Sequence, residues 1–240
     1  MPLLNSIFYL AAPILLFGSL TYFIKINQTK LQLLLALSAS YIFSVAIMHL
    51  LPEAYEHQNH KLVGLFIVIG FCLQLVIDTF SSGIEHGHVH SHTATCKNHF
   101  PFSIIFGLMF HSFLEGLPLY NSVTDTFNYK IMLGLALHNT PIAIAFATLL
   151  KDHHTHSIKV IALLVVFSLM APFGLLTSYF LGTNSTLNLK EFMPIAYGLI
   201  IGIFLHISTV IMFEGSENHK YNLPKILVML LGVFLAFIIS

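Results

Sequence analysis

The chain has 240 residues, with ten lysines, no arginine and ten acidic residues, so its formal net charge is zero. Only 8% of the residues are charged, against roughly 25% in an ordinary soluble domain, and 56% are hydrophobic. This composition excludes a disordered chain and a disulfide-rich secreted domain, and the lack of a basic patch excludes a nucleic-acid-binding protein. An integral membrane protein remains.

Helix-length apolar runs follow one another along the whole sequence. About 20 apolar residues in a helix cross the roughly 30 Å hydrocarbon core of a bilayer, and a helix satisfies its own backbone there. We therefore expect an all-α polytopic membrane protein, an eight-helix transmembrane bundle in which residues 1–240 form a single transmembrane domain. The predicted spans are residues 3–24, 31–52, 62–82, 101–121, 131–150, 159–181, 192–213 and 224–240.

The lysines predict the orientation of these spans, because cytoplasmic loops carry an excess of basic residues. With eight spans, one set of connections holds seven lysines, while the other set, with both termini, holds three. We expect both termini outside the cell and a multi-pass location in the cell membrane. The first span lacks a basic amino-terminal region and a small-residue cleavage site, so we expect it to be retained.

Ionisable side chains interrupt the apolar spans at residues 101–121 and 131–150. An ionisable group at bilayer depth costs several kcal/mol unless it is paired, hydrated or ligated. His111 and Glu115 are four residues apart and share a helix face, with Ser112 beside them. His138 and Asn139 lie at a similar depth in the next span.

Two imidazoles and one carboxylate at one depth on neighbouring helices form an N2O ligand set for Zn²⁺ or another first-row dication. Ser112 and Asn139 can add neutral oxygen ligands. The alternative is that His111 and Glu115 form a hydrogen-bonded pair within their helix and that His138 is a satisfied core histidine. The hydrocarbon surroundings favour the metal site.

Other ionisable residues lie towards the ends of the spans. His49 and Glu53, at the outer end of the second span, can collect cations, whereas Asp78, His206 and Glu214, in the inner halves of their spans, can pass cations on. The alternative for each is an interfacial side chain that reaches into water.

The connection at residues 83–100 is rich in histidine, and the assigned topology makes it a cytoplasmic loop. Short histidine-rich tracts bind metal ions loosely without a fold. This loop is therefore predicted to buffer metal ions, through four imidazoles at alternate positions: His86, His88, His90 and His92.

Three segments resemble the ZIP (Zrt/Irt-like) family of divalent metal transporters, in its bacterial type. Residues 48–54 (MHLLPEA) resemble the end of the family's second helix, and residues 111–116 (HSFLEG) match its fourth-helix pattern H-[NS]-x-x-[DE]-G. Residues 137–141 (LHNTP) resemble its fifth-helix motif H-E-x-P. The eight spans and the histidine-rich loop also fit.

The resemblance implies an eight-helix bundle in a 3+2+3 arrangement that moves divalent metal, typically zinc, towards the cytoplasm. The site would lie between helices four and five, with the metal ion as cargo and no cofactor, in a monomer or homodimer.

The chain departs from the family pattern at three positions. It has Asn139 and Ile142 where the fifth helix commonly carries acidic or metal-binding side chains, and Ala171 where bacterial relatives with a two-metal centre tend to have Glu before Pro. These departures predict a single-metal site.

Two other functions use a similar set of side chains. An intramembrane zinc-dependent hydrolase also holds a metal with an open water position, but the sequence has no H-E-x-x-H motif and no second midplane acid to act as base. A proton-coupled carrier of an organic solute would use His and Glu as proton relays, but it would not explain the histidine-rich loop. We therefore expect a transporter and not an enzyme.

Overall fold

The computed structural model describes residues 3–24, 27–56, 60–81, 100–121, 126–183, 189–214 and 223–239. Within these residues the chain is helical apart from short connections and one pair of two-residue strands. In chain order, the elements are α1 (Leu3–Leu20), α2 (Gln28–Val45), the π-helix η1 (Ala46–Leu50), α3 (Leu51–Tyr55), α4 (His60–Ser81), α5 (Phe102–Gly116), the 3₁₀ turn η3 (Leu117–Leu119), β1 (Tyr120–Asn121), β2 (Thr126–Phe127), α6 (Tyr129–Asp152), α7 (Ser157–Thr183), α8 (Leu189–Glu214) and α9 (Leu223–Ile239).

Seven helical stretches in the described part of the chain are long and apolar enough to cross a membrane, and α9 is a shorter apolar helix. Each of the eight predicted spans therefore contains an apolar helix, which confirms the all-α polytopic fold. Bulky apolar side chains also face outward, for example Phe106 (67% exposed), Phe173 (58%) and Phe237 (68%). Such a surface is costly in water and suits contact with lipid chains.

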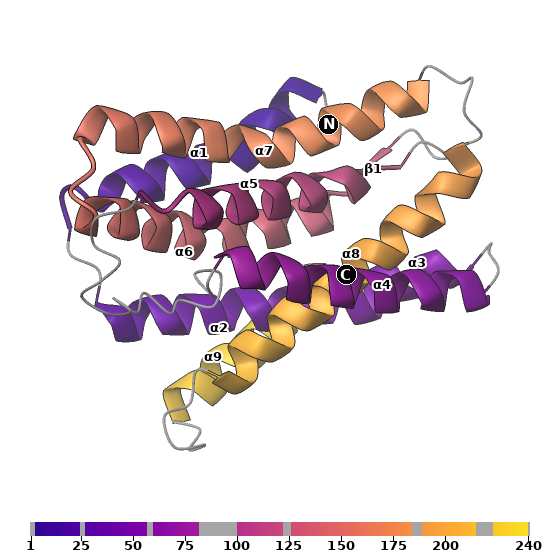
Figure 1. The fold of residues 1–240 in the computed structure, drawn as a ribbon. Helices are drawn as coiled ribbons and strands as arrows, with labels where there is room; N and C mark the ends of the chain where they lie inside the picture. Colours follow the sequence, from indigo (N-terminus) through magenta and orange to yellow (C-terminus); the bar gives the residue numbers. More distant parts are fainter. Residues whose placement is uncertain are drawn as a thin grey trace.

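The helices form two groups that lie against each other (Figure 1). In the first group, α1 packs on α6 and α7, and α5 packs on α7. In the second group, α2 packs on α8 and α9, and α4 packs on α8. The groups meet where α2 contacts α6 and where α4 contacts α5, so a site on α5 and α6 lies beside the second group.

Glycines allow α4 and α8 to approach closely in the second group. Gly198 and Gly202 are one turn apart on α8, and a Cβ atom on Gly202 would collide with the backbone carbonyl of Ile67 on α4. In the reverse direction, a Cβ atom on Gly70 would collide with the carbonyl of Leu199. Small residues spaced by four are typical of tightly packed membrane helices.

Two local departures from α-helix were not predicted. The π-helix η1 interrupts the second span just before Pro52, whose ring crowds the carbonyl four residues earlier and which has no N–H to bond it. The link from α5 to α6 contains an antiparallel pair in which Tyr120 lies opposite Phe127. Both rings pack on Tyr179 of α7, and Asn128 then caps α6 by accepting from Ile131 N. This link fixes α6 relative to α5.

The glycine packing generates a stability prediction. Gly70→Ala should lower the midpoint of thermal unfolding of the purified protein by roughly 2–10 °C, because overpacking costs about 1–3 kcal/mol. Gly64→Ala is the matched control on the same helix, since a Cβ there would meet only the Tyr55 hydroxyl, at 3.6 Å. That variant should be neutral or slightly more stable. Equal midpoints for the two variants would contradict the close approach of α4 and α8.

Candidate metal centre

Two neighbouring helices supply the polar side chains that the sequence analysis placed at the midplane. His111 and Glu115 are one turn apart on α5, because residues four apart share a helix face. His138 and Asn139 lie on α6 in the turn before Pro141. The proline stays within a continuous helix but frees the carbonyl one turn earlier.

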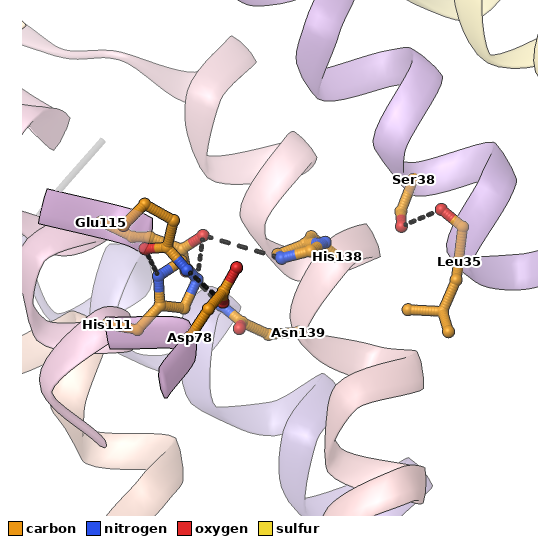
Figure 2. A network of polar contacts seen from close by, with 8 residues as sticks. Leu35, Ser38, Asp78, His111, Glu115, His138 and Asn139 are labelled. Carbon is orange, nitrogen blue, oxygen red and sulfur yellow. Dashed lines mark hydrogen bonds and ion pairs between the residues drawn. The ribbon is translucent and has the colours of Figure 1, made fainter. Parts of the chain in front are cut away.

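The side chains of His111, Glu115 and His138 meet inside the bundle with no exposed surface. Glu115 Oε1 lies 3.0 Å from His111 Nε2 and 3.8 Å from His138 Nε2. Each residue offers one ligand atom, and these atoms all lie within 4.8 Å of one another. Figure 2 shows the carboxylate and both imidazoles facing a common point.

These separations suit one small dication between the three side chains. Zinc–ligand bonds of about 2.0–2.1 Å in a tetrahedral arrangement place neighbouring ligand atoms roughly 3.3 Å apart. The separations of 3.0 and 3.8 Å from Glu115 bracket that value, and the two imidazole ligand atoms lie within 4.8 Å of each other. Small side-chain rotations would therefore be enough to bind an ion here.

Neutral oxygen and nitrogen atoms lie around the three ligands. Asn139 Nδ2 donates to Glu115 Oε2 at 3.3 Å. Ser112 Oγ and Asn139 Oδ1 are buried and have no hydrogen-bond partner among the described residues. Asn139 Oδ1 belongs to the amide that contacts Glu115, so it is a candidate for a further oxygen ligand.

The electrostatics of the centre favour a cation. A buried carboxylate is costly unless positive charge or hydrogen-bond donors offset its desolvation. Beside Glu115 lie the Asn139 amide and the imidazoles of His111 and His138, which are positive only when protonated. A dication bound between them, or protons on the imidazoles, would supply the missing charge.

A second layer of polar side chains reaches the centre from the other helix group. Gln74 of α4 is fully buried, and its Oε1 lies 3.1 Å from His111 Nδ1. Gln74 Nε2 donates to Asp78 Oδ1 at 3.2 Å. Asp78 Oδ2 in turn lies 3.4 Å from His206 Nδ1 of α8. Asp78 and His206 were predicted from the sequence, whereas Gln74 was not; its only signal is an amide four residues before Asp78 in an apolar run.

Of the remaining predicted residues, the structure describes His49 and Glu53 in full. Glu53 is half-buried on α3 and accepts from the Tyr197 hydroxyl of α8 at 3.2 Å. His49 is half-buried in the π-helix η1. Glu214 is the last residue of α8, and its side chain lies outside the described part. The loop histidines at 86, 88, 90 and 92 also lie outside the described residues.

Comparison with known proteins identifies the family of the chain. A family model described as ZIP Zinc transporter matches residues 2–102 and 97–240. Among curated proteins, Protein zntD of Dictyostelium discoideum is 28% identical over 163 residues, which cover 62% of this chain and 24% of zntD. Zinc transporter ZIP9 of Xenopus tropicalis is 25% identical over 184 residues, which cover 72% of this chain and 60% of ZIP9. Zinc transporter ZIP9-A of Xenopus laevis is 24% identical over 178 residues, which cover 70% of this chain and 58% of that protein.

The chain thus spans between about a quarter and three fifths of the length of these relatives. The family model and both ZIP9 relatives are named as zinc transporters, which confirms the prediction of a transporter family and not an enzyme family. The bacterial type stays a prediction. With its apolar helices and a family match over nearly all its residues, the chain belongs to the ZIP zinc transporter family and is a multi-pass membrane protein.

Proposed function

We propose that the chain transports divalent cations, zinc foremost, towards the cytoplasm through a site formed by His111, Glu115 and His138 between α5 and α6. The observation that carries the proposal is this buried His/Glu/His cluster, with ligand atoms within 4.8 Å of one another, inside a chain of the ZIP zinc transporter family. The zinc ion is cargo, and transport needs no cofactor.

The chemistry of the cluster suits this cargo. Imidazole nitrogen and carboxylate oxygen are ligands that Zn²⁺ prefers. A dication entering the bilayer interior must lose much of its hydration, and the negative charge of Glu115 offsets part of that cost. Ser112 and Asn139 can complete the coordination with neutral oxygen.

The cation path is proposed to follow α8. Tyr197, hydrogen-bonded to Glu53, lies nine residues before His206, or roughly 14 Å along a helix. His206 is paired with Asp78, and Glu214 ends the helix. Glu53, with His49, would collect cations on the outer side, and Asp78, His206 and Glu214 would pass them inward. We propose the cell membrane as the location, with both termini outside, the orientation that the lysine distribution favours.

One ion at a time is proposed to occupy the centre. A second, bridged ion would need more carboxylates, but α6 and α7 carry Asn139, Ile142 and Ala171 at the positions where relatives with two metals have metal-binding side chains. Ile142 and Ala171 are fully buried apolar residues. They offer no ligand atom.

Asn139→Asp tests the charge of the centre. The second carboxylate would stand beside Glu115 and replace a hydrogen bond with repulsion, so the metal-free protein should unfold at a lower temperature by several degrees. Zinc should then stabilise the variant more than it stabilises the parent, because the added charge favours a dication. Asn139→Leu is the control, which loses the hydrogen bond without adding charge. Unfolding curves with and without zinc measure both effects. If zinc raises the unfolding temperature of Asn139→Asp by no more than that of the parent, the result counts against the site.

Glu115→Gln tests the ligand set. The variant keeps the shape of the side chain but loses the charge that offsets the cost of the dication, so zinc uptake at matched membrane expression should fall at least tenfold. Asn139→Ala, which removes a neutral neighbour of Glu115 and no charge, should lower uptake less than Glu115→Gln does. Uptake of radioactive zinc into cells measures both. Parental uptake by Glu115→Gln would refute the site assignment.

The histidine-rich loop at residues 83–100 is proposed to buffer metal on the cytoplasmic side. Its imidazoles are redundant and lie outside the proposed path, so replacing His86, His88, His90 and His92 by serine should leave at least about half of the zinc uptake. The control is the unmodified chain at equal expression. Complete loss of uptake in correctly inserted protein would show that the loop takes part in transport itself.

A further inference from the structure

We propose that Gln74 is a positioning residue for the metal centre: its amide holds His111 in the tautomer that carries its proton on Nδ1 and presents a bare Nε2 to the cation. The inference rests on the proposed function, because it takes His111 Nε2 as a metal ligand. It adds a residue on α4, outside the helices that supply the ligands.

The direction of each hydrogen bond follows from which atoms of Asp78, Gln74 and His111 can donate and which can only accept. An ionised carboxylate only accepts hydrogen bonds, so Asp78 requires the NH₂ end of the Gln74 amide to point towards it, as the 3.2 Å contact has it. The amide oxygen must then face His111 Nδ1, 3.1 Å away. An oxygen acceptor there requires a proton on Nδ1.

This tautomer is the one that metal binding needs. A neutral imidazole carries one proton, so a proton on Nδ1 leaves a lone pair on Nε2. Nε2 is the atom that faces Glu115, at 3.0 Å. Hydrogen-bond partners of this kind fix the ring orientation of metal-binding histidines and raise metal affinity 10- to 100-fold.

Asp78, which accepts from the amide, has neighbours of its own. Asp78 is paired with His206 of α8 at 3.4 Å, and the ring of His206 packs edge-on against Phe71 of α4 at 4.8 Å. The second helix group therefore sets the orientation of a ligand that belongs to the first group.

Zinc affinity of the purified full-length protein tests the proposal. All variants carry serine at the loop positions 86, 88, 90 and 92, so that these four histidines do not contribute to the measured affinity. Gln74→Leu should weaken zinc binding at least tenfold, whereas Gln32→Leu, at an exposed glutamine of α2, should bind like the parent. Parental affinity in Gln74→Leu would overturn the proposal.

A polarity swap separates positioning from a merely structural role. In Gln74→Glu/Asp78→Asn, the amide at 78 donates to the carboxylate at 74, which accepts from His111 Nδ1, so the total charge and the bond direction are kept. Zinc affinity should return to within about threefold of the parent. Asp78→Asn alone leaves the Gln74 amide free to turn, so this variant should bind zinc more weakly than the swap. If Gln74→Leu does not fold, the comparison of Asp78→Asn with the swap still tests the proposal. A swap no tighter than Asp78→Asn would overturn the proposal.

Nitrogen-15 NMR of histidine-labelled, metal-free protein reads the tautomer directly. The His111 signals, assigned by their absence in His111→Gln, should show a proton on Nδ1 in the parent and in the swap, whether or not Nε2 beside Glu115 is also protonated. In Gln74→Leu, Nδ1 should lose this proton in at least part of the molecules. An unchanged tautomer in Gln74→Leu would overturn the proposal. Zinc affinity of Glu115→Gln separates failure of the metal site from failure of the role of Gln74. If Glu115→Gln binds zinc like the parent, the site assignment fails. If Glu115→Gln loses zinc binding while Gln74→Leu binds normally, only the role of Gln74 fails.

Discussion

The carboxylate of Glu115 has no exposed surface and lies inside a bundle whose outer face is apolar. A charge in that position is tolerable only when opposite charge and hydrogen-bond donors stand close to it. His111, His138 and Asn139 provide these groups from one turn of α5 and one turn of α6. The placement of these two helices therefore decides whether the buried carboxylate has partners, and we propose that a dication completes this set of charges.

The rest of the fold keeps this arrangement in place. The strand pair after α5 and the Asn128 cap of α6 set how the ligand-bearing helices follow each other. Close contact through Gly70 and Gly202 holds α4 against α8, and α4 carries Gln74 to the back of the His111 ring. Tight backbone packing in one helix group thereby orients a side chain in the other. Such indirect positioning costs less than a second buried charge, because an amide brings a fixed hydrogen-bond direction and no net charge.

Much of this could be predicted from the sequence, because the bilayer imposes strong rules. Helix length and hydrophobicity located all eight spans, and the four-residue spacing of His111 and Glu115 placed both on one face. His138 lies at a similar depth in the next span, and this position predicted that a second helix contributes to the site. Gln74 escaped prediction because an uncharged amide in an apolar run gives little signal, and its role depends on which helix lies next to α5. The π-helix before Pro52 and the strand pair also escaped, since both arise from local backbone crowding and tertiary contacts that periodicity does not encode.

The most direct measurement of the central claim is anomalous X-ray diffraction at the zinc absorption edge, from crystals of the full chain grown with zinc. One anomalous peak is expected inside the bundle, within bonding distance of His111 Nε2, Glu115 and His138, with no second ion bridged to it. Two bridged peaks at that level would contradict the single-ion centre. A helix interior without a peak, in crystals that show zinc elsewhere, would contradict the site itself.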